Sequence, residues 1–155
     1  MTIFTAKEAC MNHFFISIGS NFQSETTIPK AITMMKKEFN AFFYTSSVIR
    51  STAIDKKGHE CPDIPPYDNV VGFGLTHCSL DEMIVLLKSV ESKLGRIRSE
   101  THHKIVHLDL DLVEWNNEIL RTWEVEQHFY IVCKKNLLEK IQTIFSINDC
   151  SKFDL

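Results

Sequence analysis

Residues 107–112 read His-Leu-Asp-Leu-Asp-Leu, a strict alternation of polar and apolar side chains. Successive side chains of a β-strand point to opposite faces of a sheet, so this alternation predicts a strand with one buried face. The leucines would share the buried face, and His107, Asp109 and Asp111 would share the other. Carboxylates two residues apart on a strand lie about 7 Å apart at their Cα atoms, so their oxygens can converge on one Mg²⁺ ion. An acidic strand face exposed to solvent is the alternative interpretation of the same residues.

A helix is predicted just before this strand. Ser79 and Glu82 have the spacing of a capping box, and Gly95 suits the C-terminal end of the helix. Apolar residues recur between them at helical intervals, at Leu80, Met83, Ile84, Leu87, Val90 and Leu94.

Cationic and imidazole side chains lie between this helix and the strand, at Arg96, Arg98, His102, His103 and Lys104. Carboxylates that bind a metal, next to cations that bind phosphate, are the groups that phosphoryl transfer requires. The sequence therefore favours a site for a nucleotide and Mg²⁺ around residues 96–111.

The remaining patterns predict the order β-α-β-β-α-β, followed by a short β-α tail. Residues 14–18 form a predicted strand, and a helix capped by Thr26 or Thr27 follows it. Further predictions are β-structure over 42–54, a loop over 55–66, a strand over 69–78, a last strand over 129–133 and a helix over 137–145. This order is typical of a ferredoxin-like α+β fold, an antiparallel sheet with helices packed on one face.

The composition is that of an ordinary globular protein. The chain has 155 residues, 44% hydrophobic and 24% charged, which fits one domain. A net charge of −3 provides no basic field for nucleic acid. No apolar stretch is long enough to span a membrane, and the N-terminal segment is unlike a signal peptide. The five cysteines have no CxxC spacing, which favours reduced thiols in a cytoplasmic protein.

Several short motifs, in order, resemble the 6-hydroxymethyl-7,8-dihydropterin pyrophosphokinase (HPPK) family of folate biosynthesis. Leu94-Gly95-Arg96-Ile97-Arg98 followed by residues 108–112 is similar to that family's signature. Ile16-Ser17-Ile18-Gly19-Ser20-Asn21 resembles its first strand and GSN turn, and Ser46-Ser47 and Tyr67-Asp68-Asn69 resemble two further elements. The resemblance runs from about residue 14 to residue 120 and implies one HPPK-like domain over residues 1–155, with a shortened C-terminal region.

The resemblance also implies an activity and a set of site residues. The family transfers pyrophosphate from ATP to the hydroxymethyl group of a dihydropterin and releases AMP, so ATP and a pterin are the expected partners. Asp109 and Asp111 would bind two Mg²⁺ ions, and Arg96 and Arg98 would be catalytic. The implied ATP-binding residues are Lys88, Glu91, Arg96, Arg98 and His107, and the implied pterin-binding residues are Ser51, Thr52, Ile54, Tyr67, Asn69 and Phe129.

The chain departs from the family pattern at several positions. Val106 stands where the family has an arginine, and His103 stands where it has an aromatic residue. Residues 121–128 contain no Pro-His pair, and Asp68 replaces a leucine. These departures leave open a non-catalytic or very slow relative that binds a pterin, a nucleotide or a protein partner. An RNA-binding ferredoxin-like domain is a third interpretation, which the net charge opposes.

Overall fold

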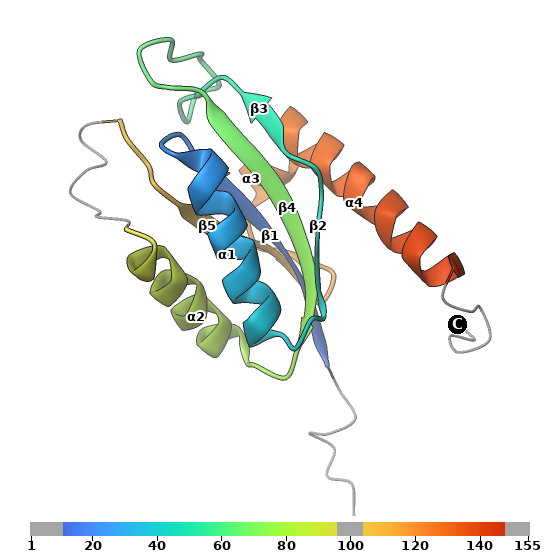
Figure 1. The fold of residues 1–155 in the computed structure, drawn as a ribbon. Coiled ribbons are helices and arrows are strands. Elements are labelled where there is room, and N and C mark those ends of the chain that lie inside the picture. The colour runs from blue at the N-terminus through green and yellow to red at the C-terminus, as the bar shows by residue number, and fades with distance from the viewer. Residues whose placement is uncertain (1–10, 96–103, 148–155) are drawn as a thin grey trace, which may run out of the picture.

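The computed structural model describes residues 11–95 and 104–147. Within these residues the chain folds into a six-stranded antiparallel sheet with four helices (Figure 1). The elements in chain order are β1 (Asn12–Ser20), α1 (Ser24–Glu38), β2 (Phe43–Thr45), β3 (Ile49–Ser51), β4 (Tyr67–Thr76), α2 (Leu80–Lys93), β5 (Asp109–Trp115), β6 (Glu118–Ile119), α3 (Thr122–Val125) and α4 (His128–Ile147). The strand order is β2-β4-β1-β5-β6, and β3 also pairs with β4.

The central strand β1 pairs with β4 on one side and with β5 on the other. Gly72 and Gly74 of β4 lie directly under aromatic rings of the core. A Cβ atom at Gly72 would overlap the Phe43 ring, and one at Gly74 would overlap the Phe14 ring. These glycines therefore allow the close approach that large aromatic side chains require against the sheet.

Helices α1 and α2 cover one face of the sheet, as Figure 1 shows. The alternating leucines Leu108, Leu110 and Leu112 are buried on this face, which confirms the predicted orientation of the strand. The capping box of α2 is also confirmed, because Ser79 Oγ accepts from the Glu82 amide and Glu82 accepts from the Ser79 amide, both at 3.2 Å.

The prediction that the helices pack on one face only is wrong. Helix α4 lies on the opposite face, where Tyr130, Cys133 and Leu137 pack against Val71 and Val113. Residues 129–133, predicted as a strand, form the first turns of this helix, and the helix predicted over 137–145 is its continuation. A short apolar run does not by itself distinguish a strand from a buried helix. This segment forms a helix because the second apolar face of the sheet must be buried against another element.

The start of α1 and one additional short helix also differ from the sequence predictions. Helix α1 begins at Ser24, after Gln23 in a left-handed conformation, rather than at Thr26 or Thr27. The short helix α3, which the sequence did not predict, follows the hairpin of β5 and β6.

A bulge and a tight turn direct the chain after β5. The register with β1 shifts between Phe15 and Ile16, opposite Glu114 and Leu112. Asn116 and Asn117 then have φ values of 47° and 69°, which suits a two-residue hairpin turn. This hairpin brings α3 back beside the polar face of β5.

In the part of the chain that the structure describes, no helix is long and apolar enough to cross a membrane.

Candidate active site

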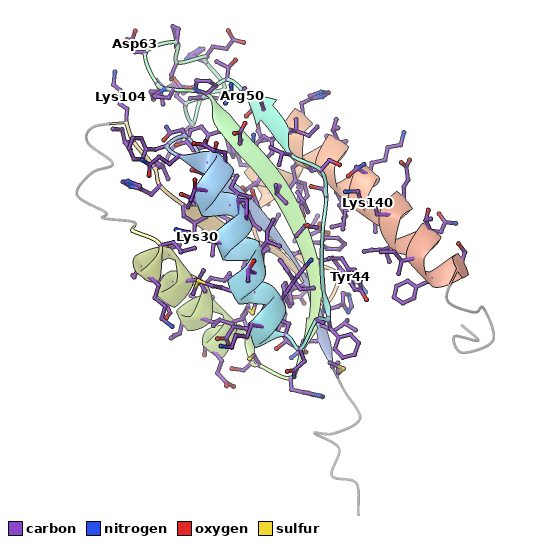
Figure 2. The ribbon with its side chains drawn as sticks, viewed as in Figure 1. Lys30, Tyr44, Arg50, Asp63, Lys104 and Lys140 are labelled. Atoms are coloured by element: carbon purple, nitrogen blue, oxygen red, sulfur yellow. The ribbon has the colours of Figure 1, made fainter. Side chains whose placement is uncertain are left out.

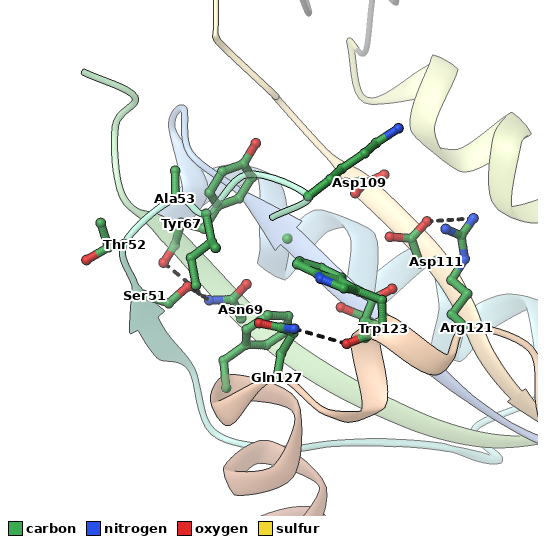
Figure 3. A pocket seen from close by; sticks show the side chains of 16 residues that line it. Ser51, Thr52, Ala53, Tyr67, Asn69, Asp109, Asp111, Arg121, Trp123 and Gln127 are labelled. Atoms are coloured by element: carbon green, nitrogen blue, oxygen red, sulfur yellow. Dashed lines mark hydrogen bonds and ion pairs between the residues drawn. The ribbon is translucent and has the colours of Figure 1, made fainter. Parts of the chain in front are cut away.

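A cavity of about 580 Å³ lies beside the polar face of β1 and β5 (Figure 3). Aromatic rings from three elements line it, namely Tyr67 of β4, Trp123 of α3 and Phe129 of α4. We call it the aromatic cavity. Its other lining residues are Ser17, Gly19, Ser51, Thr52, Ala53, Ile54, Lys56, Asn69, Asp109, Asp111, Arg121, Glu124 and Gln127. All six residues that the resemblance assigns to the pterin therefore lie around one cavity, although β4 and α4 are far apart in sequence.

Asn69 forms the polar end of the aromatic cavity. Its amide nitrogen donates to the carbonyl oxygen of Ile49 at 3.0 Å and to Ser51 Oγ at 2.7 Å. These bonds orient the side chain so that its carbonyl oxygen lies near Gly19, at the cavity wall. An amide oxygen held in this way is suited to accept from an N–H group on the edge of a planar ring.

A second cavity, of about 650 Å³, lies between α2 and β5, and we call it the α2 cavity. Lys88 and Glu91 reach it from α2, and Arg121 reaches it from the opposite side. The Glu91 side chain is 5% exposed, and its Oε1 accepts from the Leu110 amide at 2.7 Å. Glu91 is thus bonded to the edge of the strand that carries both aspartates.

Asp109 and Asp111 line both cavities. They lie on the polar face of β5, opposite Gly19 and Ser17 of β1. Arg121 also lines both cavities, and its Nη2 contacts Asp111 Oδ1 at 3.1 Å (Figure 3). The boundary between the cavities is therefore formed by two acids and one guanidinium group.

The carboxylates at this boundary are crowded. Burial and the neighbouring charges of Asp109 and Glu124 raise the pKa of Asp111 to about 8. Burial also raises the pKa of Glu124, although a hydrogen bond from Ser17 opposes this increase. Like charges held in a poorly solvated place disfavour one another's ionisation, and a divalent cation would remove that cost.

The donor set fits Mg²⁺ bound together with phosphates. Among the described residues no group of three or more His, Cys, Asp or Glu side chains has a metal-binding arrangement. Mg²⁺ does not need such a group, because one or two carboxylates, substrate phosphates and water commonly complete its coordination. Asp109 and Asp111 supply hard oxygen ligands beside two cavities, so the residues present fit this ion.

Other predicted residues lie elsewhere. Arg96, Arg98, His102 and His103 fall outside the described residues. His107 belongs to the lining of neither cavity, and its ring packs edge-on against Phe22, with centroids 4.7 Å apart. It precedes the start of β5, so the regular alternation that orients the aspartates does not extend to it.

The GSN turn fixes the chain just before β5. Asn21 accepts from the Val106 amide at 2.6 Å and donates to the Lys104 carbonyl at 2.8 Å. The Lys104 side chain approaches Asp63 at 3.9 Å at the same end of the molecule (Figure 2). Asn21 therefore sets where the strand bearing the aspartates begins.

Asp68, which stands where the family has a leucine, does not place its charge in the aromatic cavity. Its neighbours Tyr67 and Asn69 face that cavity, and strand alternation turns Asp68 the other way. It accepts from Ser24 Oγ and from Arg50 Nε. Although burial opposes the change, these two bonds lower the pKa of Asp68.

A family model described as 7,8-dihydro-6-hydroxymethylpterin-pyrophosphokinase (HPPK) matches residues 15–142. The chain belongs to the HPPK family. The matched range extends from β1 into α4 and so includes both cavities. Membership in the HPPK family supports a pyrophosphokinase function toward a pterin in folate biosynthesis. A comparison with curated proteins found no match.

Sequence reasoning missed one segment that lines the candidate site. Residues 121–127 contribute Arg121, Trp123, Glu124 and Gln127 to the aromatic cavity. Their only sequence signal was that several polar and aromatic side chains follow the hairpin. Ser17 was also missed, although a hydroxyl between Ile16 and Ile18 in a buried strand is a recognisable exception.

Proposed function

We propose that this member of the HPPK family transfers pyrophosphate from ATP to 6-hydroxymethyl-7,8-dihydropterin, with Mg²⁺ held by Asp109 and Asp111. One observation carries the proposal: the two aspartates line both cavities at their common boundary. A pterin in the aromatic cavity and a nucleotide in the α2 cavity would meet at these carboxylates. This is where phosphoryl transfer needs neutralisation of charge.

In this reaction the hydroxymethyl oxygen of the pterin forms a bond to the β-phosphorus of ATP. The bond from that phosphorus to the oxygen bridging the α- and β-phosphates breaks, and the electron pair leaves with AMP. The hydroxyl proton is released. Such a transfer needs alignment of the two substrates rather than a protein nucleophile.

The aromatic cavity supplies the groups that hold a pterin. Tyr67 and Phe129 offer ring faces for stacking, and the carbonyl oxygen of Asn69 accepts from the ring edge. Ser51, Thr52 and Ile54 line the same wall beside β3. Together they would hold the ring in one plane and direct its hydroxymethyl group to the aspartates.

The α2 cavity supplies cations and carboxylates for the nucleotide. Lys88 would bind phosphate, and Glu91 would hold β5 in place through the Leu110 amide. When bound, Mg²⁺ would neutralise phosphate charge and hold the polyphosphate against the acceptor. Arg96 and Arg98 remain proposed catalytic residues, and the number of ions remains two in this proposal.

We also infer that the fold is of the ferredoxin-like class, in a single HPPK domain. The order β2-β4-β1-β5, with α1 and α2 on one face, supports that class. The proposed localisation is cytoplasmic, and no nucleic-acid or membrane partner is proposed.

The test is an AMP-release assay with ATP, Mg²⁺ and 6-hydroxymethyl-7,8-dihydropterin. The expected result is release of AMP that requires all three components and falls by at least about a thousandfold in Asp109→Ala. Asp63→Ala is a matched control, because Asp63 is an exposed acid outside both cavities. AMP release that does not depend on the pterin would contradict the proposed acceptor.

Val106 favours a second candidate, a relative that binds both substrates without turnover. Valine has no group that binds phosphate, at a position where the family has an arginine. Calorimetric binding of the pterin and the Mg·nucleotide, with no AMP after long incubation, would identify this second function.

A further inference from the structure

Arg121 is held at the boundary of the two cavities by its backbone. The Leu120 and Arg121 amides both donate to the Val113 carbonyl, at 2.8 and 3.3 Å, and Val113 lies in the bulged part of β5. The Arg121 carbonyl in turn accepts from the Glu124 amide at 3.2 Å, at the start of α3. The α-carbon therefore has a fixed position beside the aspartates, although the side chain is 54% exposed.

Its side chain combines two properties that no other cation among the described lining residues has. Arg121 reaches both cavities, whereas Lys56 lines only the aromatic cavity and Lys88 only the α2 cavity. It also forms an ion pair with Asp111, one of the two proposed metal ligands. It therefore lies where the phosphate group passing between the two substrates would be.

The ion pair of Arg121 and Asp111 conflicts with metal binding. A divalent cation on Asp111 would compete for the oxygen that Arg121 contacts and would repel the guanidinium group. A bound polyphosphate at the same boundary offers new oxygens, and guanidinium groups bind phosphate through two parallel N–H donors. When a Mg·nucleotide binds, both effects favour the transfer of the Arg121 guanidinium group from the Asp111 carboxylate to phosphate oxygens.

Building on the proposed function, we propose that Arg121 exchanges Asp111 for the β- and γ-phosphates of the bound nucleotide. In this role Arg121 is a catalytic residue that supplies the positive charge missing at Val106. The hairpin of β5 and β6 brings Arg121 back beside β5, so the segment after this strand supplies a charge that Val106, before the strand, lacks.

A purely structural role makes a different prediction. If Arg121 only neutralised Asp111, its removal would free that carboxylate for Mg²⁺. The Mg·nucleotide would then bind as tightly as before or more tightly. The two roles therefore differ in whether removal of Arg121 weakens the affinity for the nucleotide.

The test compares Arg121→Gln, Arg121→Lys and the control Arg50→Gln by calorimetry. The ligands are the Mg²⁺ complex of α,β-methylene-ATP, which cannot release AMP, and AMP, which lacks the outer phosphates. Arg50 is a matched control, because it pairs with Asp68 at the same 3.1 Å but is absent from the lining of both cavities.

We expect Arg121→Gln to weaken the methylene-ATP complex about tenfold or more and to leave the affinity for AMP within about twofold. Arg121→Lys should recover part of the loss, and Arg50→Gln should bind like the wild type. In the AMP-release assay, Arg121→Gln should lower kcat about a hundredfold. Thermal unfolding of each variant checks that it is folded, and if Arg121→Gln does not fold, the same comparison is made with Arg121→Lys.

Unchanged or tighter binding of the methylene-ATP complex by Arg121→Gln would overturn the inference about Arg121. Failure of the wild-type protein to bind that complex at all would instead refute the proposed function. The two failures are thus distinguished by the wild-type titration.

Discussion

The carboxylate of Glu91 accepts a hydrogen bond from the Leu110 amide at 2.7 Å, between the two aspartates of β5. The bond joins α2 to the edge of the strand whose other edge pairs with β1. Glu91→Ala leaves a buried amide without this partner, so we expect a loss of about 1–3 kcal/mol in the free energy of unfolding. Urea denaturation measures the loss.

Glu91→Gln is the matched variant, because its amide oxygen can still accept from Leu110. It should keep most of the stability that Glu91→Ala loses. Equal losses in both variants would show that the charge of Glu91, rather than this hydrogen bond, is what stabilises β5.

The stability of the metal-free protein should depend on pH through Asp111. Burial raises the pKa of Asp111 to about 8, from an ordinary value of 3.8. Between these pH values the folded protein binds more protons than the unfolded chain, so the free energy of unfolding falls as pH rises. We expect the melting temperature to drop by several degrees from pH 5 to pH 8, and Asp111→Asn to reduce that drop.

Mg²⁺ should oppose this loss, because it competes with the proton for the same carboxylates. Its stabilising effect, measured as the rise in melting temperature, should be larger at pH 8 than at pH 5. An effect of Mg²⁺ that is independent of pH would argue against a metal site at Asp111.

Pterin binding should quench the fluorescence of Trp123. This side chain is 46% exposed at the aromatic cavity, whereas Trp115 is 8% exposed in the core on the other face of the sheet. We expect Trp123→Phe to abolish the quenching in a titration with the pterin, and Trp115→Phe to retain it. Quenching that persists in Trp123→Phe would place the ligand elsewhere.

Asn21 should stabilise the entry to β5. Asn21→Ala removes the acceptor for the Val106 amide and the donor to the Lys104 carbonyl, so we expect a loss of about 1–3 kcal/mol in stability. Asn21→Asp keeps the acceptor and should lose less. Chemical denaturation compares the two, and a neutral Asn21→Ala would contradict this role.

The predictions from sequence succeeded where a local pattern has one physical outcome. The alternation over 108–112 fixed which side chains of β5 are buried, and the Ser79–Glu82 pair fixed the start of α2. The run over 129–133 failed because apolar residues suit a strand and a buried helix equally well. Only the uncovered apolar face of the sheet decided between them.

The sequence by itself determined that Asp109 and Asp111 share the polar face of a strand, because the period of a strand leaves no other arrangement. It also determined family membership, since several short motifs occur in the family's order. Only the tertiary structure decided that Arg121, Trp123 and Glu124 line the same cavity as these aspartates. Their positions depend on a bulge and a hairpin that return the chain to β5, and neither feature leaves a periodic signal in the sequence.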